Sequence, residues 1–370
     1  MSINLYFCNP VRLKEPVIVK VMTTKTQQIR IEDFDYPLPD ERIAKFPLPK
    51  RDESKLLLYK EGKVSESIFK HITDYLPEGS LMVFNNTRVI QARLLFQKET
   101  GAKIEIFCLE PVEPHDYALV FQQTECCRWT CLVGNLKKWK EGLLKKEVQL
   151  DGETVILKAE KLQTCGDSYL IEFTWDHPTC TFADLLDAAG VLPIPPYLNR
   201  ETEKSDLQTY QTVYSKIKGS VAAPTAGLHF TQEILKKLED KGVQVGYVTL
   251  NVGIGTFRPV KCDNILDHHM DSEVFEIRQE TADLINRAKA DGKKLVAVGT
   301  TTVRTLESAY KMFGKIQACK GASELFIYPP YKFGVVDKLI TNFHLPKSTL
   351  LMLVSALAGK DFIFEAYAEA

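Results

Sequence analysis

The chain has 370 residues, of which 45% are hydrophobic and 26% are charged. This composition is typical of a soluble folded protein rather than a disordered one, and the length allows two domains with separate cores. The formal net charge of -1 excludes the bulk positive charge of a histone-like nucleic-acid binder, so any contact with RNA has to come from a local patch.

The nine cysteines are irregularly spaced and include the adjacent pair Cys126 and Cys127. This spacing offers no even disulfide framework and no repeated C-x-x-C pair for zinc, and it is typical of a reducing compartment. The apolar stretches are too short for a signal peptide at the N-terminus and for a membrane helix at residues 350–357. We therefore expect a cytoplasmic protein without a membrane span.

The chain divides into an extension, an α/β domain and a β-rich insert. Residues 1–30 lack clear domain character and contain a second start at Met22, so we interpret them as an N-terminal extension that could be mobile. Residues 31–88 carry strand signals such as KLLLY and LMVFN. Over residues 89–177, short β-branched and aromatic runs, YALVF among them, alternate with turns and predict an inserted antiparallel β-barrel or sandwich.

From residue 178 onward, helix and strand patterns alternate. Thr181 is placed to cap the helix FADLLDAA, which Gly190 ends, and Thr231 is placed to cap EILKKLED before the strand VQVGYVTLNV. A further helix is expected from about residue 280 to 290, then the strand KLVAV and the helix TVRTLESAYKMF. This alternation predicts a mainly parallel sheet covered by helices, formed by residues 31–88 and 178–370 together.

Loops that follow strands are the usual ligand sites of open α/β sheets. In LMVFNNTRV, Asn85, Thr87 and Arg88 offer amide, hydroxyl and guanidinium groups at one point, although an ordinary asparagine-rich turn also explains them. In GSVAAPTAGLHFT, small residues around Thr225 allow the backbone to lie close to a ligand, and His229 is the only titratable side chain. A hydrogen-bonded structural histidine is the alternative interpretation.

The segment VTLNVGIGTFRPV is a strand that ends in Gly253 and Gly255, followed by Thr256 and Arg258. It lacks the third glycine of the dinucleotide fingerprint, so it does not support NAD binding. The glycines instead suit an adenine or ribose against bare backbone, with Arg258 available for a carboxylate or phosphate. A strand bulge and a structural salt bridge would explain the same residues.

Two more loops join a strand to a helix. In VAVGTTTVRTLESA, the amides and hydroxyls around Gly299, Thr300 and Thr301 lie at a helix N-terminus, where they could hold a methionine carboxylate. Arg304 is poorly placed against the helix dipole unless an anion or a buried carboxylate compensates it. In KLITNFHLPKS, Asn342 precedes His344, for which half-burial would lower the pKa and favour the neutral, proton-accepting form. A loop histidine whose hydrogen bonds are satisfied within the protein is the alternative interpretation.

A basic stretch, LKKWKEGLLKK, lies in the insert. It could follow an RNA backbone, or it could be a solvated hairpin edge whose lysines oppose aggregation. Its charged and aromatic members are Lys137, Lys138, Trp139, Lys140, Lys145 and Lys146.

Seven segments occur in the order FDYPLP, IAKFPLPKRDESKLL, VFNNTRVIQARL, GSVAAPTAGLHFT, VGIGTFRPV, VAVGTTTVRTLES and LITNFHLPKSTLLMLVSA. Together they closely resemble the S-adenosylmethionine:tRNA ribosyltransferase-isomerase family of queuosine biosynthesis. The resemblance covers about residue 31 to the C-terminus. GSVAAPTAGLHFT and the last segment are long and unusual in composition, so coincidence is a poor explanation.

The resemblance implies an α/β domain with a distorted, barrel-like mixed sheet that carries an inserted β-barrel domain. It also implies transfer and isomerisation of the ribosyl part of S-adenosylmethionine onto aminomethyl-deazaguanine at the tRNA wobble position, which gives epoxyqueuosine and releases adenine and methionine. S-adenosylmethionine would be a co-substrate, with no metal or other cofactor required. The expected partners are S-adenosylmethionine and the precursor tRNA, bound by a monomer.

The sulfonium makes the adjacent ribose carbon acidic, so a modest base could form an ylide whose collapse expels adenine. We expect His229 or His344 to be that base. The expected catalytic residues are His229, His344, Thr225, Asn85 and Arg88. The residues expected to bind S-adenosylmethionine are Gly253, Gly255, Thr256, Arg258, Gly299, Thr300, Thr301, Arg304 and Asn342.

The chain departs from the family pattern where Asn251 and Asp271 replace two histidines. Neither residue can replace histidine as an acid at neutral pH. A catalytically altered or inactive RNA-binding paralogue is therefore an alternative hypothesis. A third hypothesis is a metal-dependent hydrolase, whose ligands would be His268, His269, Asp271 and Glu273.

Overall fold

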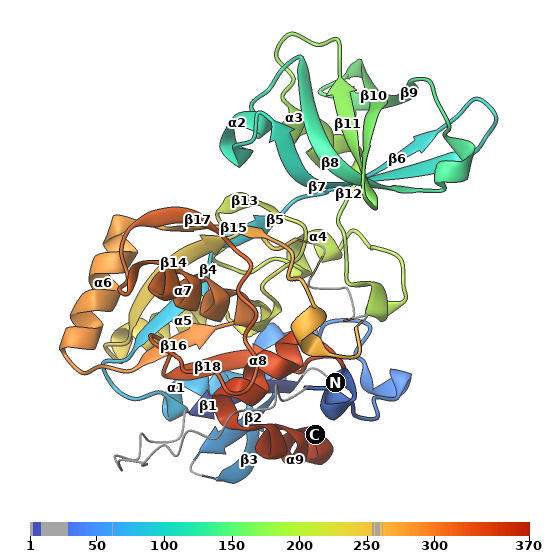
Figure 1. The fold of residues 1–370 in the computed structure, drawn as a ribbon. Helices are drawn as coiled ribbons and strands as arrows, with labels where there is room; N and C mark the ends of the chain where they lie inside the picture. Colours follow the sequence, from blue (N-terminus) through green and yellow to red (C-terminus); the bar gives the residue numbers. More distant parts are fainter. Residues whose placement is uncertain (1–2, 9–28, 61, 254, 256–259, 261) are drawn as a thin grey trace.

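The computed structural model describes residues 3–8, 29–60, 62–253, 255, 260 and 262–370. Within these residues the chain forms a larger α/β body and a separate antiparallel sheet, which lies above the body in Figure 1. The predicted mixed α/β class is confirmed. No helix in the described part of the chain combines the length and the apolar character needed to cross a bilayer.

The large sheet has nine strands, and its centre is parallel. Strands β14, β4, β16 and β18 are neighbours in this order and run in the same direction. Their carboxyl ends therefore meet at one edge of the sheet. Across the whole sheet the strands are, in spatial order, Cys319–Ser323 (β17), Glu273–Ile277 (β15), Gln244–Leu250 (β14), Leu81–Asn85 (β4), Leu295–Val298 (β16), Lys338–Asn342 (β18), Ile3–Cys8 (β1), Lys55–Lys60 (β2) and Lys63–Ile68 (β3).

Helices cover both faces of this sheet, which explains why β4 and β16 are continuous apolar runs with every residue buried. Alternate residues of β4 belong to different cores, because Leu81 and Val83 face one side and Met82 and Phe84 the other. The first core contains Gln279–Ala290 (α6), Thr300–Phe313 (α7), Thr349–Ala358 (α8) and Lys360–Glu369 (α9). The second contains Ile72–Tyr75 (α1) and Gln232–Asp240 (α5).

Part of the N-terminal segment forms a strand. Ile3–Cys8 runs antiparallel to β18 and parallel to β2, so this part of the expected extension is a strand of the large sheet. Sequence alone could not reveal this, since the strand takes its hydrogen bonds from segments far along the chain. Residues 1–2 and 9–28, which include Met22, lie outside the described residues.

The insert is a seven-stranded, fully antiparallel sheet. The predicted inserted β-barrel is not confirmed, because the sheet is curled and open. Among the described residues no ladder joins β9 to β6, and a hydrogen bond from Lys146 Nζ to the Leu95 carbonyl (2.8 Å) links the two strands. In spatial order its strands are Gly190–Val191 (β12), Arg93–Gln97 (β6), Lys103–Glu113 (β7), Cys126–Gly134 (β8), Ser168–Thr174 (β11), Glu153–Cys165 (β10) and Leu144–Leu150 (β9).

Two local details differ from the sequence interpretation. YALVF was predicted as a strand but forms the short helix Tyr117–Phe121 (α2), because the Asp116 side chain accepts hydrogen bonds from the first free amides. The helix Phe182–Ala189 (α3) begins and ends where predicted, with a capping box at Thr181. It packs, however, into the core of the insert, which therefore extends past residue 177 to β12.

A two-stranded parallel ribbon lies between the two bodies. It consists of Thr87–Val89 (β5), which follows β4 directly, and Ile217–Ser220 (β13). In Figure 1 this ribbon lies where the chain passes from the α/β body to the insert. Beside it are the remaining short helix, Asp206–Thr209 (α4), and the loop of small residues that leads to the 3-10 helix Thr225–His229.

The junction of α3 with β12 allows a test of the insert boundary. An added Cβ at Gly190 would lie 2.1 Å from the Gln91 carbonyl oxygen and 2.5 Å from that of Leu186, both backbone atoms. We expect Gly190→Ala to destabilise the insert by about 1–3 kcal/mol. The measurement is urea unfolding followed by tryptophan fluorescence, because all three tryptophans of the chain, Trp129, Trp139 and Trp175, are buried in the insert core.

Gly246→Ala in β14 is the matched control. Its Cβ would meet only side-chain atoms, two from α6 at 3.4 Å and one from Leu81 at 3.9 Å, and the residue lies in the other body. It should leave the tryptophan transition unchanged. An unchanged transition in Gly190→Ala would show that α3 and β12 do not contribute to the stability of the insert.

Candidate active site at the ends of the parallel strands

Polar residues from four strands gather at the carboxyl edge of the parallel sheet. Asn85 ends β4, Asn251 follows β14, Thr301 follows β16, and Asn342 ends β18. These positions are separated by up to 257 residues of sequence but become neighbours because the four strands are parallel and adjacent. Open α/β sheets usually bind ligands at this edge.

Asn85 is fully buried, and its side-chain amide links three elements. The Nδ2 group donates to the Leu250 carbonyl (3.0 Å) and to Thr301 Oγ1 (3.3 Å). The Oδ1 atom accepts from the backbone amides of Leu250 (3.0 Å) and Thr87 (3.2 Å). All donor and acceptor positions of the amide are therefore used. In this arrangement Asn85 positions its neighbours and offers no free group to a ligand.

Asn251, which stands where a histidine was expected, lies against the small-residue loop. Its Oδ1 atom accepts a hydrogen bond from Thr87 Oγ1 (3.2 Å). An added Cβ at Gly219 would come within 2.8 Å of the Asn251 amide, so only glycine permits this approach. The amide thus occupies the space between the loop and the ribbon. Arg88, the residue after Thr87, is exposed on the opposite face of β5.

His229 is buried, and both of its ring nitrogens have partners. Nδ1 lies 3.0 Å from Ser54 Oγ and 3.3 Å from the Arg51 carbonyl, and Nε2 lies 3.1 Å from Asn342 Oδ1. Burial lowers the pKa of the imidazole to about 4, although the hydrogen bonds to Arg51 and Asn342 favour the charged form. His229 is therefore neutral at neutral pH.

His344 has a similar electrostatic state but a different environment. Its Nε2 lies 3.2 Å from Thr341 Oγ1 and its Nδ1 lies 3.2 Å from the Tyr367 hydroxyl. Its carbonyl accepts a hydrogen bond from Tyr36. Burial lowers the pKa of the imidazole to about 3. Because its partners come from α9 and the N-terminal part of the body, His344 is held toward the C-terminal helix, whereas Asn342, two residues earlier, contacts His229.

The first turn of α7 has free backbone donors. Gly299 precedes the helix with a φ of +86°, which favours glycine, and provides no side-chain cap. The Thr302 and Thr305 hydroxyls bond carbonyls one turn earlier and so do not cap the helix either. Thr300 and Thr301 are both buried. A helix start without a side-chain cap is the geometry that an anion site needs, so the predicted carboxylate site at this turn stays a prediction.

Arg304 already has a partner for its charge. Its Nη1 atom forms an ion pair with Glu273, and its Nη2 atom donates to the Ser323 carbonyl (3.1 Å). The other oxygen of Glu273 accepts the backbone amide of Gly253 (2.9 Å). The buried carboxylate is the compensation that a cation in the first turns of a helix requires. The Arg304–Glu273 pair therefore links α7, β15 and the glycine loop, and Glu273 neutralises the charge of Arg304.

An acidic side chain from the segment before β15 lies against the glycine loop. An added Cβ at Gly255 would lie 2.1 Å from Asp271 Oδ2, so the carboxylate rests against the glycine where we expected a ribose or adenine. Across the domain boundary, partial burial raises the pKa of Glu110, and the nearby Asp271 and Glu273 carboxylates add to this, while His115 opposes it. Thr256 and Arg258 lie outside the described residues.

Three other sequence predictions are resolved in part by the structure. Thr225 begins the 3-10 helix that carries His229 and is partly exposed. In the described part of the chain, no three histidine, cysteine or acidic side chains meet as they would around a metal ion. Trp139 is fully buried, so it cannot be a stacking platform for RNA, and its Nε1 group donates to the Gly142 carbonyl.

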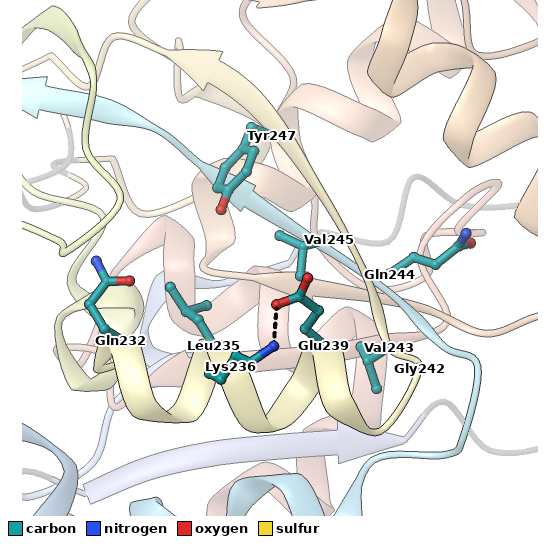
Figure 2. A pocket seen from close by; sticks show the side chains of 9 residues that line it. All are labelled: Gln232, Leu235, Lys236, Glu239, Gly242, Val243, Gln244, Val245 and Tyr247. Carbon is teal, nitrogen blue, oxygen red and sulfur yellow. Dashed lines mark hydrogen bonds and ion pairs between the residues drawn. The ribbon is translucent and has the colours of Figure 1, made fainter.

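A groove of about 620 Å³ lies elsewhere, between α5 and the beginning of β14. Figure 2 shows the Lys236–Glu239 ion pair on its α5 side and Tyr247 on its β14 side. The groove is lined by the amino-terminal half of β14, whereas the candidate site lies at the carboxyl end of that strand. None of the sequence-predicted site residues lines it.

Two residues near His229 were not selected from the sequence. Ser54 is buried and holds the ring at Nδ1, and Arg51 contributes its carbonyl to the same nitrogen. The signal that could have identified them was the segment IAKFPLPKRDESKLL, which contains both residues and was used only as part of the resemblance.

Comparison with known proteins identifies the family. The model of the family described as queuosine biosynthesis protein matches residues 31–370. The chain belongs to this family. The matched range begins at the residue where the sequence pattern of the α/β domain was seen to begin, and it includes the insert.

Named relatives of the queuosine biosynthesis family match nearly the whole chain. A protein of Clostridioides difficile (strain 630) named S-adenosylmethionine:tRNA ribosyltransferase-isomerase is 47% identical over 347 residues, 92% of this chain and 95% of that protein. A protein of the same name from Pelobacter propionicus is 44% identical over 342 residues, 92% and 94% of the two chains. The crystal structure of the S-adenosylmethionine tRNA ribosyltransferase of Thermotoga maritima is 35% identical, covers 91% of this chain and 94% of that one, and has a TM-score of 0.48.

The two buried histidines predict an acid-sensitive fold. The unfolded chain binds protons at these imidazoles near pH 6.5, whereas burial lowers their pKa to about 4 and about 3 in the folded state. Stability is therefore complete above about pH 6.5 and falls as the pH decreases toward 4. At pH 5 each buried histidine is expected to cost about 2 kcal/mol. The measurement is the urea midpoint at pH 7.5 and pH 5.

His344→Gln should weaken this pH dependence, whatever its effect on stability at pH 7.5. His71→Gln, at an exposed position in the same body, should retain the full dependence. If the His344 variant loses as much stability between pH 7.5 and pH 5 as the unsubstituted protein, the imidazole does not stay neutral in the folded state.

The buried ion pair should be strongly coupled. Glu273→Gln leaves the Arg304 guanidinium buried without a counter-charge, and we expect a loss of about 3 kcal/mol in unfolding free energy. Adding Arg304→Gln should restore part of that loss, since both groups are then neutral. Glu239→Gln breaks an exposed pair with Lys236 and should leave the urea midpoint unchanged. Additive losses in the double variant would contradict the coupling.

Proposed function

We propose that the protein transfers and isomerises the ribosyl moiety of S-adenosylmethionine onto aminomethyl-deazaguanine at the wobble position of a tRNA anticodon. The products are epoxyqueuosine-tRNA, adenine and methionine. The observation that carries the proposal is the family match over residues 31–370, together with relatives of that name at 44–47% identity over 92% of the chain. With this support the reading as an inactive RNA-binding paralogue is not favoured.

The geometry at the strand ends supports a site for a nucleoside that carries a carboxylate. The uncapped first turn of α7, at Gly299 and Thr300, suits the methionine carboxylate, because its amides point out of the helix. Asp271 and Glu110 give the neighbouring surface a negative potential. Such a potential favours the sulfonium and ammonium groups of S-adenosylmethionine and the amine of the base.

The buried histidines suit the accepting side of proton transfer. With pKa values of about 4 and about 3, His229 and His344 hold no proton to donate at neutral pH. We assign the base to His229, because it lies at the strand ends beside Asn342, whereas His344 is held by Tyr36 and Tyr367. Proton transfer to a buried imidazole forms a charged imidazolium. For His229 to act as an efficient base, this charge has to be stabilised in the complex with the substrates.

We further propose that S-adenosylmethionine is the only small molecule required, that the partner macromolecule is the precursor tRNA, and that the enzyme acts as a monomer in the cytoplasm, where tRNA is modified.

The reaction is tested directly by product release. Purified protein is incubated with S-adenosylmethionine and tRNA that bears the aminomethyl-deazaguanine base, and adenine and methionine are quantified together with the mass of the modified nucleoside. We expect one adenine and one methionine for each epoxyqueuosine formed, and none with tRNA that has guanine at the wobble position. Binding of the precursor tRNA without adenine release would contradict the proposal.

The base assignment has its own variants. His229→Asn should lower the rate of adenine release by about 100-fold or more, which is the usual contribution of a positioned base. His71→Asn, at an exposed position, should retain the rate. Unchanged release in both His229→Asn and His344→Asn would remove both histidines from the chemistry while leaving the overall reaction intact.

A further inference from the structure

We propose that Arg88, Lys216 and Lys218 form a phosphate-binding row that holds the backbone of the tRNA anticodon strand beside the candidate active site. The inference rests on the proposed function and deepens it, since it assigns where the RNA substrate docks. The row lies on the β5–β13 ribbon between the two bodies, a surface that the sequence interpretation did not connect with RNA.

The regular geometry of the ribbon places the three cations on one face. Lys218 and Arg88 are direct partners across the parallel pair. Lys216 lies directly before β13, and its backbone amide donates to the Asn86 carbonyl (2.8 Å), next to the first residue of β5. Side chains two apart along an extended segment point the same way, about 6.6 Å apart, which places Lys216 on the side of Lys218. Arg88 and Lys216 are exposed, and Lys218 is about one-third exposed. The outward face of the ribbon therefore carries three positive charges.

The inward face of the same ribbon contacts the candidate site. Thr87, one residue before Arg88, is fully buried and donates to Asn251. Gly219, one residue after Lys218, packs against the amide of the same asparagine. A strand of RNA held on the outward face would thus lie one strand thickness from the ends of β4 and β14. This distance suits a base that is turned out of the strand toward the site.

Most of the charge in the row is free to meet phosphates. Among the described residues, neither Arg88 nor Lys216 forms an ion pair, whereas Lys218 pairs with Asp187 at 2.7 Å. Asp187 is 54% exposed, so its attraction is screened and a phosphate can compete for the lysine. Arginine and lysine are the usual phosphate ligands at RNA backbones, and such contacts carry little sequence preference.

The basic stretch of the insert is a weaker candidate for the same role. Trp139, which would have to stack on bases, is fully buried in the insert core. Lys146 is occupied by the Leu95 carbonyl, and burial lowers its pKa. Lys145 lies on the edge strand β9, where exposed charge opposes strand pairing, and Lys137 and Lys138 lie in the 3-10 turn Leu136–Lys138 that follows β8. These observations favour the ribbon over the insert as the surface for RNA.

The test measures the salt dependence of tRNA binding. The double variant Arg88→Gln/Lys216→Gln and the control Lys137→Gln/Lys138→Gln on the insert are compared with the unsubstituted full chain. The probe is an unmodified tRNA transcript followed by fluorescence anisotropy from 50 to 300 mM KCl, so the readout does not depend on turnover. Tryptophan fluorescence during urea unfolding checks that the insert remains folded in each variant.

We expect the ribbon variant to lose about tenfold or more in affinity at low salt, with the slope of log K against log salt reduced by about 1 per cation removed. The control should bind like the unsubstituted protein. Arg88→Lys/Lys216→Arg, which keeps both charges, should restore most of the affinity. In turnover, the KM for tRNA should rise in the ribbon variant and the KM for S-adenosylmethionine should not.

Three results would overturn the proposal: unchanged salt dependence in the ribbon variant, loss of tRNA affinity in the control variant instead, or a raised KM for S-adenosylmethionine with normal tRNA binding. The last result would assign the row to the methionine carboxylate. If the unsubstituted protein releases no adenine from precursor tRNA but the ribbon variant still loses its salt slope, the row stands and only the proposed function fails.

Discussion

Where parallel strands end, their last backbone N–H and C=O groups need partners from outside the sheet. At the end of β14 the buried side-chain amide of Asn85 provides these partners for Leu250. It bonds both backbone groups of Leu250 and also bonds Thr301 and Thr87, so one side chain connects β14, α7 and the ribbon. A buried backbone group without a partner costs on the order of 1–3 kcal/mol. The floor of the candidate site is therefore held by a residue whose own polar groups are all used.

Burial also decides the charges around this floor. The two histidines are neutral because water is excluded from their rings, and the buried charge of Arg304 is paired with the Glu273 carboxylate. Among the described residues, charge without an ion-pair partner lies further out, at Asp271 on one side and at Arg88 and Lys216 on the outward face of the ribbon. The buried part of the candidate site is thus neutral, Asp271 adds negative charge beside it, and the ribbon adds positive charge on its outward face. This distribution suits a cationic small molecule together with a polyanionic one.

The ribbon joins this site to the insert. Its strands come from segments about 130 residues apart, one leading out of β4 and one leading into the small-residue loop, and the insert is folded from the chain between them. The insert has its own core, which contains all three tryptophans and α3. β5 leads from the α/β body to the insert, and β13 lies where the chain returns. A ligand bound across the ribbon therefore contacts both connecting segments.

The sequence by itself determined the features that depend on nearby residues. Apolar runs marked the buried strands, Thr181 and Thr231 marked helix starts, and the strand-end loops were recognised as polar. The tertiary structure alone decided which of these loops meet: His229 finds Asn342 across 113 residues and Ser54 across 175. It also decided that α3 packs with the insert, that Trp139 is buried and that Ile3–Cys8 joins the sheet. The physical reason is that periodicity and capping act within a few residues, whereas partners and burial depend on how parallel strands distant in sequence are placed side by side.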